Sequence, residues 1–216
     1  CRQVRVDLGR FELSSENRRI LRKGKGIDVE LVPRAKYNYN PERRQFFKTY
    51  ADIKFGNDVM TFERLDALFN SPIISHLLVF TDTDAGKEIG VATLYVEGKA
   101  LAFYYYAFYD LNYYARNLGM FMMTSAVELF AERGVKHLYL GTCYSQTALY
   151  KTQFEGSQFF NGFRWSDDMD ELKFIIKRDK KELTQHLLET QEYRDEFYDS
   201  NLGNITNASA FKIRLK

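Results

Sequence analysis

The 216-residue sequence is poor in the residues that build metal sites and disulfide frameworks. It contains two Cys, three His, three Pro and one Trp. Cys1 and Cys143 lie too far apart to form a metal cluster by themselves, and His76 and His137 have no partner at the spacing of metal ligands. No Ser-His-Asp order is visible either. We therefore expect no metal, no bound cofactor and no serine-hydrolase chemistry.

Long apolar runs are also missing. No segment has the ~20 consecutive apolar residues that a membrane-spanning helix needs, and no signal peptide is visible. We expect a cytoplasmic protein with no membrane partner, whose cysteines stay reduced. The sequence contains instead 18 Phe and 15 Tyr in 216 residues, enough for one sizeable aromatic core.

The net charge of +2 is distributed unevenly along the chain. Residues 1–55 carry 14 Lys and Arg against 7 Asp and Glu, whereas the remaining residues carry 17 against 22. A basic arm joined to an acidic body indicates an anionic partner for the arm. The alternative is a solvated basic face without a partner.

Part of this charge falls on one short predicted helix, which Ser14 or Ser15 caps and Gly24 ends. Like charges at this spacing repel one another unless phosphates or carboxylates lie nearby. The side chains could grip the phosphates of a nucleic acid, or they could pack across aromatic residues of the body. The four cations of the helix are Arg18, Arg19, Arg22 and Lys23.

The stretch 101–165 has the pattern of strand, helix, strand and helix. Residues 101–109 (LAFYYYAFY) form an apolar and aromatic run typical of a buried strand. Residues 118–133 have helical apolar spacing, residues 137–140 form a second short strand, and Ser145 caps the next helix. This order predicts two parallel neighbouring strands, with any ligand at their carboxyl ends.

The other segments complete a mixed α/β (α+β) domain flanked by helices. Residues 75–80 and 89–96 form, with the central strand, an antiparallel meander. We divide the chain into a basic segment 1–55, a main domain 56–198 and a tail 199–216. Late in the chain we expect a strand over residues 171–177, a long charged helix from a capping box at 179–182 to about Tyr198, and a last strand in the tail.

These patterns resemble the GNAT N-acetyltransferase fold, in which two central strands splay apart around an acyl donor. Ala148, Tyr150 and Phe154 resemble the A-x-x-x-Y-x-x-x-G-F segment of that superfamily. Its R/Q-x-x-G-x-G/A phosphate turn is altered here, because Arg116 to Phe121 (RNLGMF) has a bulky residue at the last small position. We expect Phe121 to hinder the approach of a phosphate to the helix N-terminus.

A set of short motifs follows in order along the chain: Phe108-Tyr109-Asp110, Leu118-Gly119, Tyr139-Leu140-Gly141, Tyr150-Lys151 with Phe154, and Trp165. This ordered set more closely resembles the C-terminal domain of arginyl-tRNA–protein transferases. The opening Cys1-Arg2 and the segment 14–21 (SSENRRIL) also resemble that family's N-terminal motifs. The resemblance implies a GNAT-like fold that uses charged tRNA in place of acetyl-CoA, and a protein or peptide with an acidic N-terminal residue as acceptor.

Two residues are candidates for the chemistry of such a transfer. Tyr150 could protonate the departing ribose oxygen, because a phenol with a pKa near ~10 protonates an alkoxide yet stays protonated at pH 7. Asp110 could accept hydrogen bonds from the incoming ammonium or from a cationic aminoacyl side chain. The alternatives are a core tyrosine and an aspartate that caps a turn.

Further residues are predicted to contact the substrates. Because side chains alternate along a strand, Tyr104 and Tyr106 should share one face and Tyr109 should lie on the other. The predicted substrate-binding residues are Tyr104, Tyr106, Tyr109, Arg116, Gly119, Tyr139, Gly141, Cys143, Tyr144, Lys151, Arg164 and Trp165. The predicted tRNA-binding residues are Arg5, Arg18, Arg19, Arg22 and Lys23.

Two other functions fit the same patterns. One is an acyl-CoA-dependent N-acetyltransferase that uses acetyl-CoA, and the other is a non-catalytic module that binds tRNA or a peptide. We expect no DNA partner in any of these cases.

Overall fold

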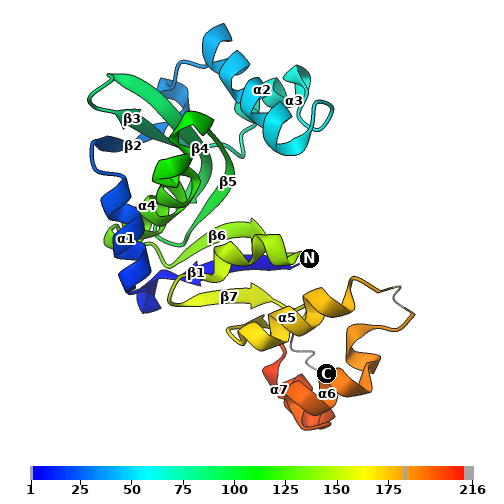
Figure 1. Cartoon of the computed structure of the whole chain (residues 1–216). Helices are drawn as coiled ribbons and strands as arrows, with labels where there is room; N and C mark the ends of the chain where they lie inside the picture. Colours follow the sequence, from blue (N-terminus) through cyan, green and yellow to red (C-terminus); the bar gives the residue numbers. More distant parts are fainter. Residues whose placement is uncertain (1, 182–183, 212–216) are drawn as a thin grey trace.

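The computed structural model describes residues 2–181 and 184–211. Its centre is an eight-stranded sheet with the strand order β2-β3-β4-β5-β6-β1-β7-β8, shown in Figure 1. The β5–β6 pair is parallel and the other neighbours are antiparallel. The strands are β1 (Gln3–Asp7), β2 (Ile27–Pro33), β3 (His76–Asp82), β4 (Lys87–Glu97), β5 (Leu101–Tyr109), β6 (His137–Thr142), β7 (Ser157–Phe160) and β8 (Trp165–Ser166).

The helices begin where the sequence supplies capping side chains. Ser14 and Asn17 form a capping box, Asn40 accepts a hydrogen bond from the Arg43 amide, and Thr61 caps the next helix. None of the described helices could cross a bilayer. The α-helices are α1 (Ser15–Lys23), α2 (Pro41–Phe55), α3 (Phe62–Asn70), α4 (Leu118–Glu132), α5 (Met169–Arg178), α6 (Gln191–Tyr198) and α7 (Leu202–Ala208). The 3₁₀ helices are η1 (Leu8–Arg10), η2 (Arg34–Lys36), η3 (Leu111–Arg116), η4 (Gln146–Thr152) and η5 (Leu187–Glu189).

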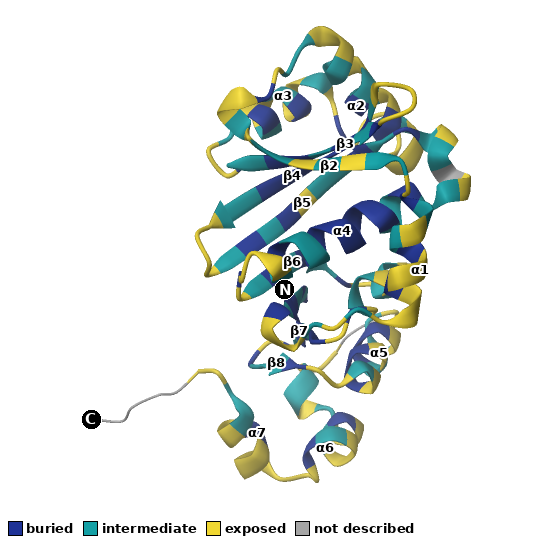
Figure 2. Cartoon of the chain, turned by 90° about the vertical axis from the view of Figure 1, so that its left-hand side faces the viewer, coloured by how far each residue is buried: buried dark blue, intermediate teal, exposed yellow. Residues whose placement is uncertain are grey.

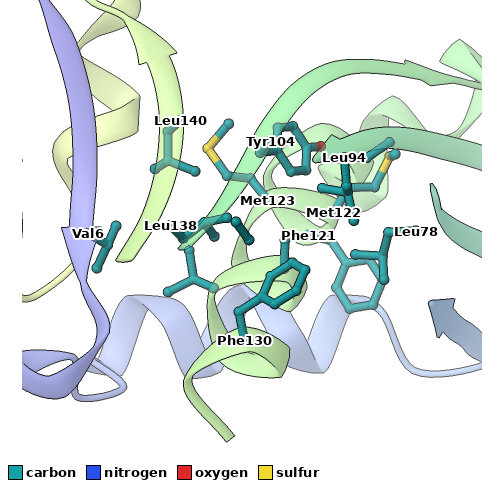
Figure 3. Close-up of a cluster of buried hydrophobic side chains, with 14 of the residues drawn as sticks. Val6, Leu78, Leu94, Tyr104, Phe121, Met122, Met123, Phe130, Leu138 and Leu140 are labelled. Atoms are coloured by element: carbon teal, nitrogen blue, oxygen red, sulfur yellow. The ribbon is translucent and has the colours of Figure 1, made fainter. Parts of the chain in front are cut away.

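Helices cover both faces of the sheet, as Figure 2 shows. Helices α1 and α4 pack on one face, where Phe121 and Met122 bury against Leu78 and Leu94 (Figure 3). Helices α2 and α3 pack on the opposite face around Phe47. A third cluster joins α5, α6 and α7 to the β1–β7 end. The predicted mixed sheet with flanking helices is therefore confirmed.

The two parallel strands splay apart soon after they begin. Only Leu101 to Phe103 of β5 pair with His137 to Tyr139 of β6. Beyond these residues β5 continues for six more positions and β6 for three, without further pairing between them. The splayed carboxyl ends leave backbone and side chains free to line an opening, as the GNAT-like pattern predicts.

A β-bulge in β5 corrects the predicted orientation of its tyrosines. Leu94 of β4 faces Tyr104, whereas Ala92 faces Ala107, so β5 has one extra residue at this point. The buried Thr93 hydroxyl accepts a hydrogen bond from the Tyr106 amide at 3.0 Å and donates one to the Tyr106 carbonyl at 3.2 Å.

The bulge resets the alternation of the side chains along β5. Tyr104 and Ala107 pack in the core beneath α4, whereas Tyr106 packs with Phe108 beneath α2 and α3. Tyr109 touches both cores. The prediction that Tyr104 and Tyr106 share a face is therefore wrong, because it assumed an unbroken strand.

Two predictions for the last quarter of the chain also need correction, and a third lies mostly outside the described residues. Residues 171–177 belong to helix α5, because Asp168 caps it and Leu172, Ile175 and Ile176 form its buried face. The long helix is replaced by η5 and the short α6, and Asp179 ends α5. In the tail, residues 202–208 form α7, and most of the predicted last strand lies outside the described residues.

Candidate active site

A cleft of about 550 Å³ opens where β5 and β6 separate. We call it the tyrosine cleft, because Tyr50, Tyr104, Tyr109 and Tyr150 line it from three parts of the fold. Helix α2 supplies Tyr50, β5 supplies the next two, and η4 supplies Tyr150. The other lining residues used below are Phe55, Tyr106, Asn117, Leu118, Gly119, Met120, Met123, Leu140 and Lys151.

The hydroxyl groups of these tyrosines influence one another. Burial raises the pKa of Tyr104, and the nearby Tyr150 and Tyr109 raise it further. Burial likewise raises the pKa of Tyr50, and the nearby Tyr109 adds to this rise. Burial also raises the pKa of Tyr150. The phenols of Tyr50, Tyr104 and Tyr150 are therefore neutral hydrogen-bond donors at pH 7. Tyr150 is 46% exposed and Tyr104 only 5%, so Tyr150 is the more accessible of these two to a large substrate.

Lys151 places a positive charge beside Tyr150. Its Nζ donates a hydrogen bond to the Thr142 carbonyl at 2.8 Å, and burial lowers its pKa. The same Nζ lies 3.6 Å from the position that a Cβ atom of Gly141 would take. Cys143 is fully buried and outside the lining, with its thiol directed to the Ser145 carbonyl at 3.8 Å. Its predicted place in the pocket is therefore not supported by the geometry.

The start of α4 forms one wall of the cleft. Asn117 has a left-handed φ of 55° and its side chain makes no capping hydrogen bond. Phe121, which we expected to obstruct this turn, instead packs in the core against Phe80 and Gly24 and is only 5% exposed. The expected obstruction by Phe121 is therefore wrong, because the side chain points away from the cleft. Tyr109 covers the turn instead, against Gly119.

Asp110 lies beside the tyrosine cleft rather than within it. Its Oδ2 lies 2.9 Å from Lys87 Nζ, and its Oδ1 accepts hydrogen bonds from the Asn112 amide and side chain. Burial alone would raise the pKa of Asp110, but the hydrogen bonds from Lys87 and Asn112 outweigh it and leave the pKa lowered. Asp110 is thus an ionised carboxylate that also caps the turn into η3.

Several predicted substrate contacts lie outside the cleft. Arg116 donates to the Lys23 and Lys25 carbonyls and holds α1 against α4. The remaining residues have other aromatic or polar partners: Tyr139 contacts Phe103 and Trp165, Arg5 stacks 3.9 Å above the Trp165 ring, and Tyr144 lies beneath Arg2.

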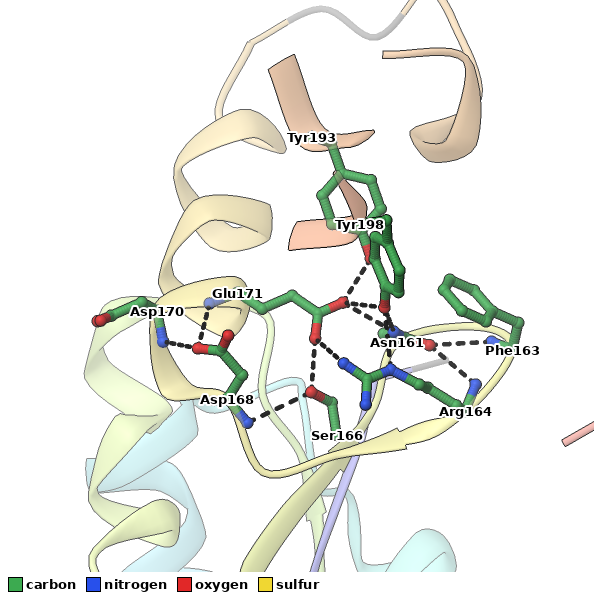
Figure 4. A network of polar contacts seen from close by, with 9 residues as sticks. All are labelled: Asn161, Phe163, Arg164, Ser166, Asp168, Asp170, Glu171, Tyr193 and Tyr198. Atoms are coloured by element: carbon green, nitrogen blue, oxygen red, sulfur yellow. Dashed lines mark hydrogen bonds and ion pairs between the residues drawn. The ribbon is translucent and has the colours of Figure 1, made fainter. Parts of the chain in front are cut away.

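Arg164 belongs to a buried polar network shown in Figure 4. Its Nε donates to the Tyr198 hydroxyl at 2.9 Å, and its guanidinium lies 3.3 Å from the fully buried Glu171 carboxylate. Glu171 also accepts hydrogen bonds from Asn161, Ser166 and Tyr193. The network joins α5 and α6 to the β7–β8 turn, which explains why Arg164 does not reach the cleft.

The cations of α1 differ in how far they are already paired. Arg19 forms a bidentate contact with Glu16, and Arg18 donates to the Leu13 carbonyl. Arg22 is exposed and has no ion pair among the described residues. Helix α1 thus carries positive charge that can bind an anionic partner, on the same face of the sheet as α4.

Sequence patterns missed Tyr50, Phe55, Met120 and Met123 as cleft residues. None of the four was singled out by the motifs or the apolar spacing described above. The signal that could have identified Tyr50 is its hydroxyl, since a fully buried position would favour Phe. Among the described residues, no group of three or more His, Cys, Asp or Glu is arranged as metal ligands.

Comparison with known proteins finds a family that matches more than half of this chain. Residues 41–161 match the family described as arginine-tRNA-protein transferase, C terminus. The aspartate/glutamate leucyltransferase of Ruegeria pomeroyi is 27% identical over 172 residues, which cover 76% of this chain and 61% of that protein. The protein of the same description from Methylobacterium sp. is 30% identical over 154 residues, covering 65% and 60%. The chain thus spans about three fifths of the length of these curated relatives.

A solved structure supports the fold. The C-terminal DUF2156 domain of an Agrobacterium fabrum protein assigned as a lysylphosphatidylglycerol synthetase superposes with a TM-score of 0.50 and 19% identity. The match covers 66% of this chain and 46% of that one. At this identity the similarity concerns the fold alone.

Proposed function

Because the chain belongs to the arginine-tRNA-protein transferase C-terminal family, we propose that it moves an aminoacyl group from a charged tRNA to the N-terminal amine of a protein whose first residue is acidic. The observation that carries the proposal is the tyrosine cleft, which gathers the phenols of Tyr50, Tyr104, Tyr109 and Tyr150 at the splayed ends of β5 and β6. The reaction takes place in the cytoplasm, uses aminoacyl-tRNA as its co-substrate and needs no metal or other cofactor.

The lining of the cleft favours an apolar aminoacyl group over arginine. Leu118, Met120, Met123 and Leu140 line it, and no Asp or Glu is among its described lining residues. Lys151 adds a positive charge that would repel a guanidinium. An arginyl side chain would therefore lose its hydration without gaining a partner. Leucine fits this lining, in agreement with the names of the two relatives.

The chemistry requires a proton donor and little general base. The acceptor amine, with an ordinary pKa of about 8, is partly neutral at pH 7 and attacks the ester carbonyl. A C–N bond forms, the C–O bond to the ribose breaks, and Tyr150 donates a proton to the departing oxygen. The amine loses a proton as the amide forms, and this proton returns the Tyr150 phenolate to its neutral form. The hydroxyls of Tyr104 and Tyr109 are the candidate donors to the tetrahedral oxyanion.

The test uses tRNAs charged with radiolabelled leucine or arginine and a peptide that begins with Asp. We expect label on the peptide from leucyl-tRNA, at least tenfold less from arginyl-tRNA, and none when the peptide is N-acetylated. A larger yield from arginyl-tRNA would overturn the donor assignment alone. No label from either donor would overturn the proposed function.

An acyl-CoA acetyltransferase is the second candidate, because Phe121 does not block the start of α4. It predicts saturable binding of acetyl-CoA in calorimetry. The Tyr109 hydroxyl, which lies against Gly119, occupies space beside the helix N-terminus and argues against a bound pyrophosphate there. Absence of binding at millimolar acetyl-CoA would eliminate this candidate.

A further inference from the structure

A second cleft, of about 350 Å³, adjoins the tyrosine cleft and shares Tyr50 and Tyr109 with it. We call it the α2 cleft, because Phe46 and Ile53 of α2 form one side of it. Its other side carries Lys87 and Asp110, which are the only charged residues among its described lining residues. The α2 cleft is thus an apolar trough with one ion pair, directly beside the candidate active site.

The trough continues to the surface along α2. A third cleft, of about 550 Å³, shares Phe46 and Lys87 with the α2 cleft and extends past Arg43 and Asn38. The three clefts therefore follow one another from the tyrosine cleft to the N-terminal end of α2. A small acceptor would need only a closed pocket, whereas a polypeptide acceptor needs a groove through which the rest of its chain can extend from the site to the surface.

The ion pair in the trough combines a buried carboxylate with an accessible ammonium. The Asp110 side chain is 11% exposed and the Lys87 side chain 61% exposed, with 2.9 Å between Oδ2 and Nζ. Two donors of the Lys87 ammonium remain available. An N-terminal Asp or Glu carries the complementary charges, an α-ammonium and a side-chain carboxylate. Its ammonium can bind the Asp110 carboxylate while its carboxylate binds the Lys87 ammonium, so that no charge is left unpaired.

We propose that the α2 cleft is the binding site for the acidic N-terminal residue of the acceptor polypeptide, with Lys87 binding its side-chain carboxylate and Asp110 its α-ammonium. This inference rests on the proposed function and extends it to the choice of acceptor. Asp110 directly follows Tyr109, so an amine bound there lies next to the tyrosine cleft. The polypeptide continues through the third cleft past Arg43.

The other candidate cations are less suited to select an acidic residue. Arg116 is bonded to backbone carbonyls of Lys23 and Lys25, and Arg164 to Glu171 and Tyr198. Lys151 lies in the tyrosine cleft, bonded to the Thr142 carbonyl. Helix α2, which forms one side of the α2 cleft, packs on the face of the sheet opposite to α1 (Figure 2), so the acceptor and a tRNA held by the basic α1 approach from different sides.

The test measures binding of a C-terminally labelled peptide by fluorescence anisotropy, without tRNA. We expect the parent protein to bind a peptide that begins with Asp about tenfold more tightly than the same peptide beginning with Asn, the scale of one hydrogen bond to a charged group. Lys87→Glu should abolish this preference, and Lys87→Gln should weaken it. N-acetylation of the Asp peptide should also weaken binding, because it removes the partner of Asp110.

Lys99→Glu is the matched control, because Lys99 is exposed in the turn at the other end of β4. It should leave the preference unchanged, and unchanged tRNA binding by the Lys87 variants would show that they are folded. Equal binding of the Asp and Asn peptides by the parent, or a preference that survives in Lys87→Glu, would overturn the inference. A preference for Asp without transfer from any charged tRNA would instead overturn the proposed function and leave this site in place.

Discussion

The Tyr109 hydroxyl lies 2.7 Å from the position that a Cβ atom of Gly119 would take. Two ring atoms, at 2.9 and 3.1 Å, are almost as close. Gly119 is therefore required by the approach of a side chain, not by its backbone conformation, since its φ is not positive. The contact fixes the end of β5 against the start of α4, and so sets the shape of the tyrosine cleft.

Gly119→Ala should displace Tyr109 and cost about 1–3 kcal/mol of unfolding free energy, the usual range for overpacking. Chemical denaturation would measure the loss, and the transfer assay should show a lower rate. Combining it with Tyr109→Phe should recover part of the stability, because the hydroxyl contact disappears while the ring contacts remain. Strictly additive effects in this double-mutant cycle would contradict the proposed contact.

Thr93→Val should loosen the bulge in β5. The change keeps the shape of the side chain but leaves the Tyr106 amide without its hydrogen bond, at a cost of about 1–3 kcal/mol. We expect lower stability in urea denaturation and reduced transfer, because the bulge sets the face to which Tyr104 points. Thr93→Ser retains the hydroxyl and should behave like the parent. Equal loss in both variants would contradict the role of the Thr93 hydroxyl in holding the bulge.

This bulge also shows where prediction from sequence ends. Residues 101–109 were correctly predicted as a strand from composition alone, and α1 from the serines that cap it and the Gly24 that ends it. The bulge, however, depends on a hydroxyl in the adjacent strand, at Thr93, so no local pattern within β5 could indicate it. The gathering of Tyr50 with Tyr150, a hundred residues apart, likewise depends on tertiary packing.

The error over residues 171–177 had a different origin, because the local signal was present. Asp168 caps α5 by accepting hydrogen bonds from the Asp170 and Glu171 amides, and Asp170 and Glu171 add negative charge to its first turn. Arg164 could not be assigned correctly from sequence. Its partner Tyr198 lies 34 positions along the chain, in another helix.

Arg164→Met should affect stability rather than substrate binding. The substitution leaves the buried Glu171 carboxylate without its cation, and removing one member of a buried pair costs about 3–5 kcal/mol. Thermal denaturation should show the loss, while the KM for the acceptor peptide of the folded fraction stays unchanged. A raised KM for the acceptor peptide with unchanged stability would show instead that Arg164 binds the substrate.

Tyr150→Phe should lower the transfer rate about 100-fold or more, the scale for loss of a positioned acid, and leave tRNA affinity unchanged. Burial raises the pKa of Tyr150 above its ordinary value of 10, so the parent should keep its proton donor as the pH rises. The parent rate should therefore increase through pH 8, as the acceptor amine becomes neutral, and remain high at pH 9. A rate that falls between pH 8 and 9 would contradict this role.

Tyr144→Phe is the control for that measurement, because Tyr144 is 54% exposed and does not line the tyrosine cleft. It should retain the activity of the parent. If both variants lose activity equally, the effect is not specific to the cleft.

The exposed cations of α1 should carry most of the electrostatic attraction for tRNA. Arg18→Glu with Arg22→Glu should weaken tRNA binding and reduce its salt slope by roughly one to two units, because each lost phosphate contact removes about one released counterion. Arg19 should contribute less than either, since Glu16 already neutralises it. Lys36→Glu with Lys54→Glu makes the same change in charge at exposed positions of the opposite face, and should leave the slope nearly unchanged. Equal slopes for the two double variants, measured at several salt concentrations, would mean that net charge rather than α1 attracts the tRNA.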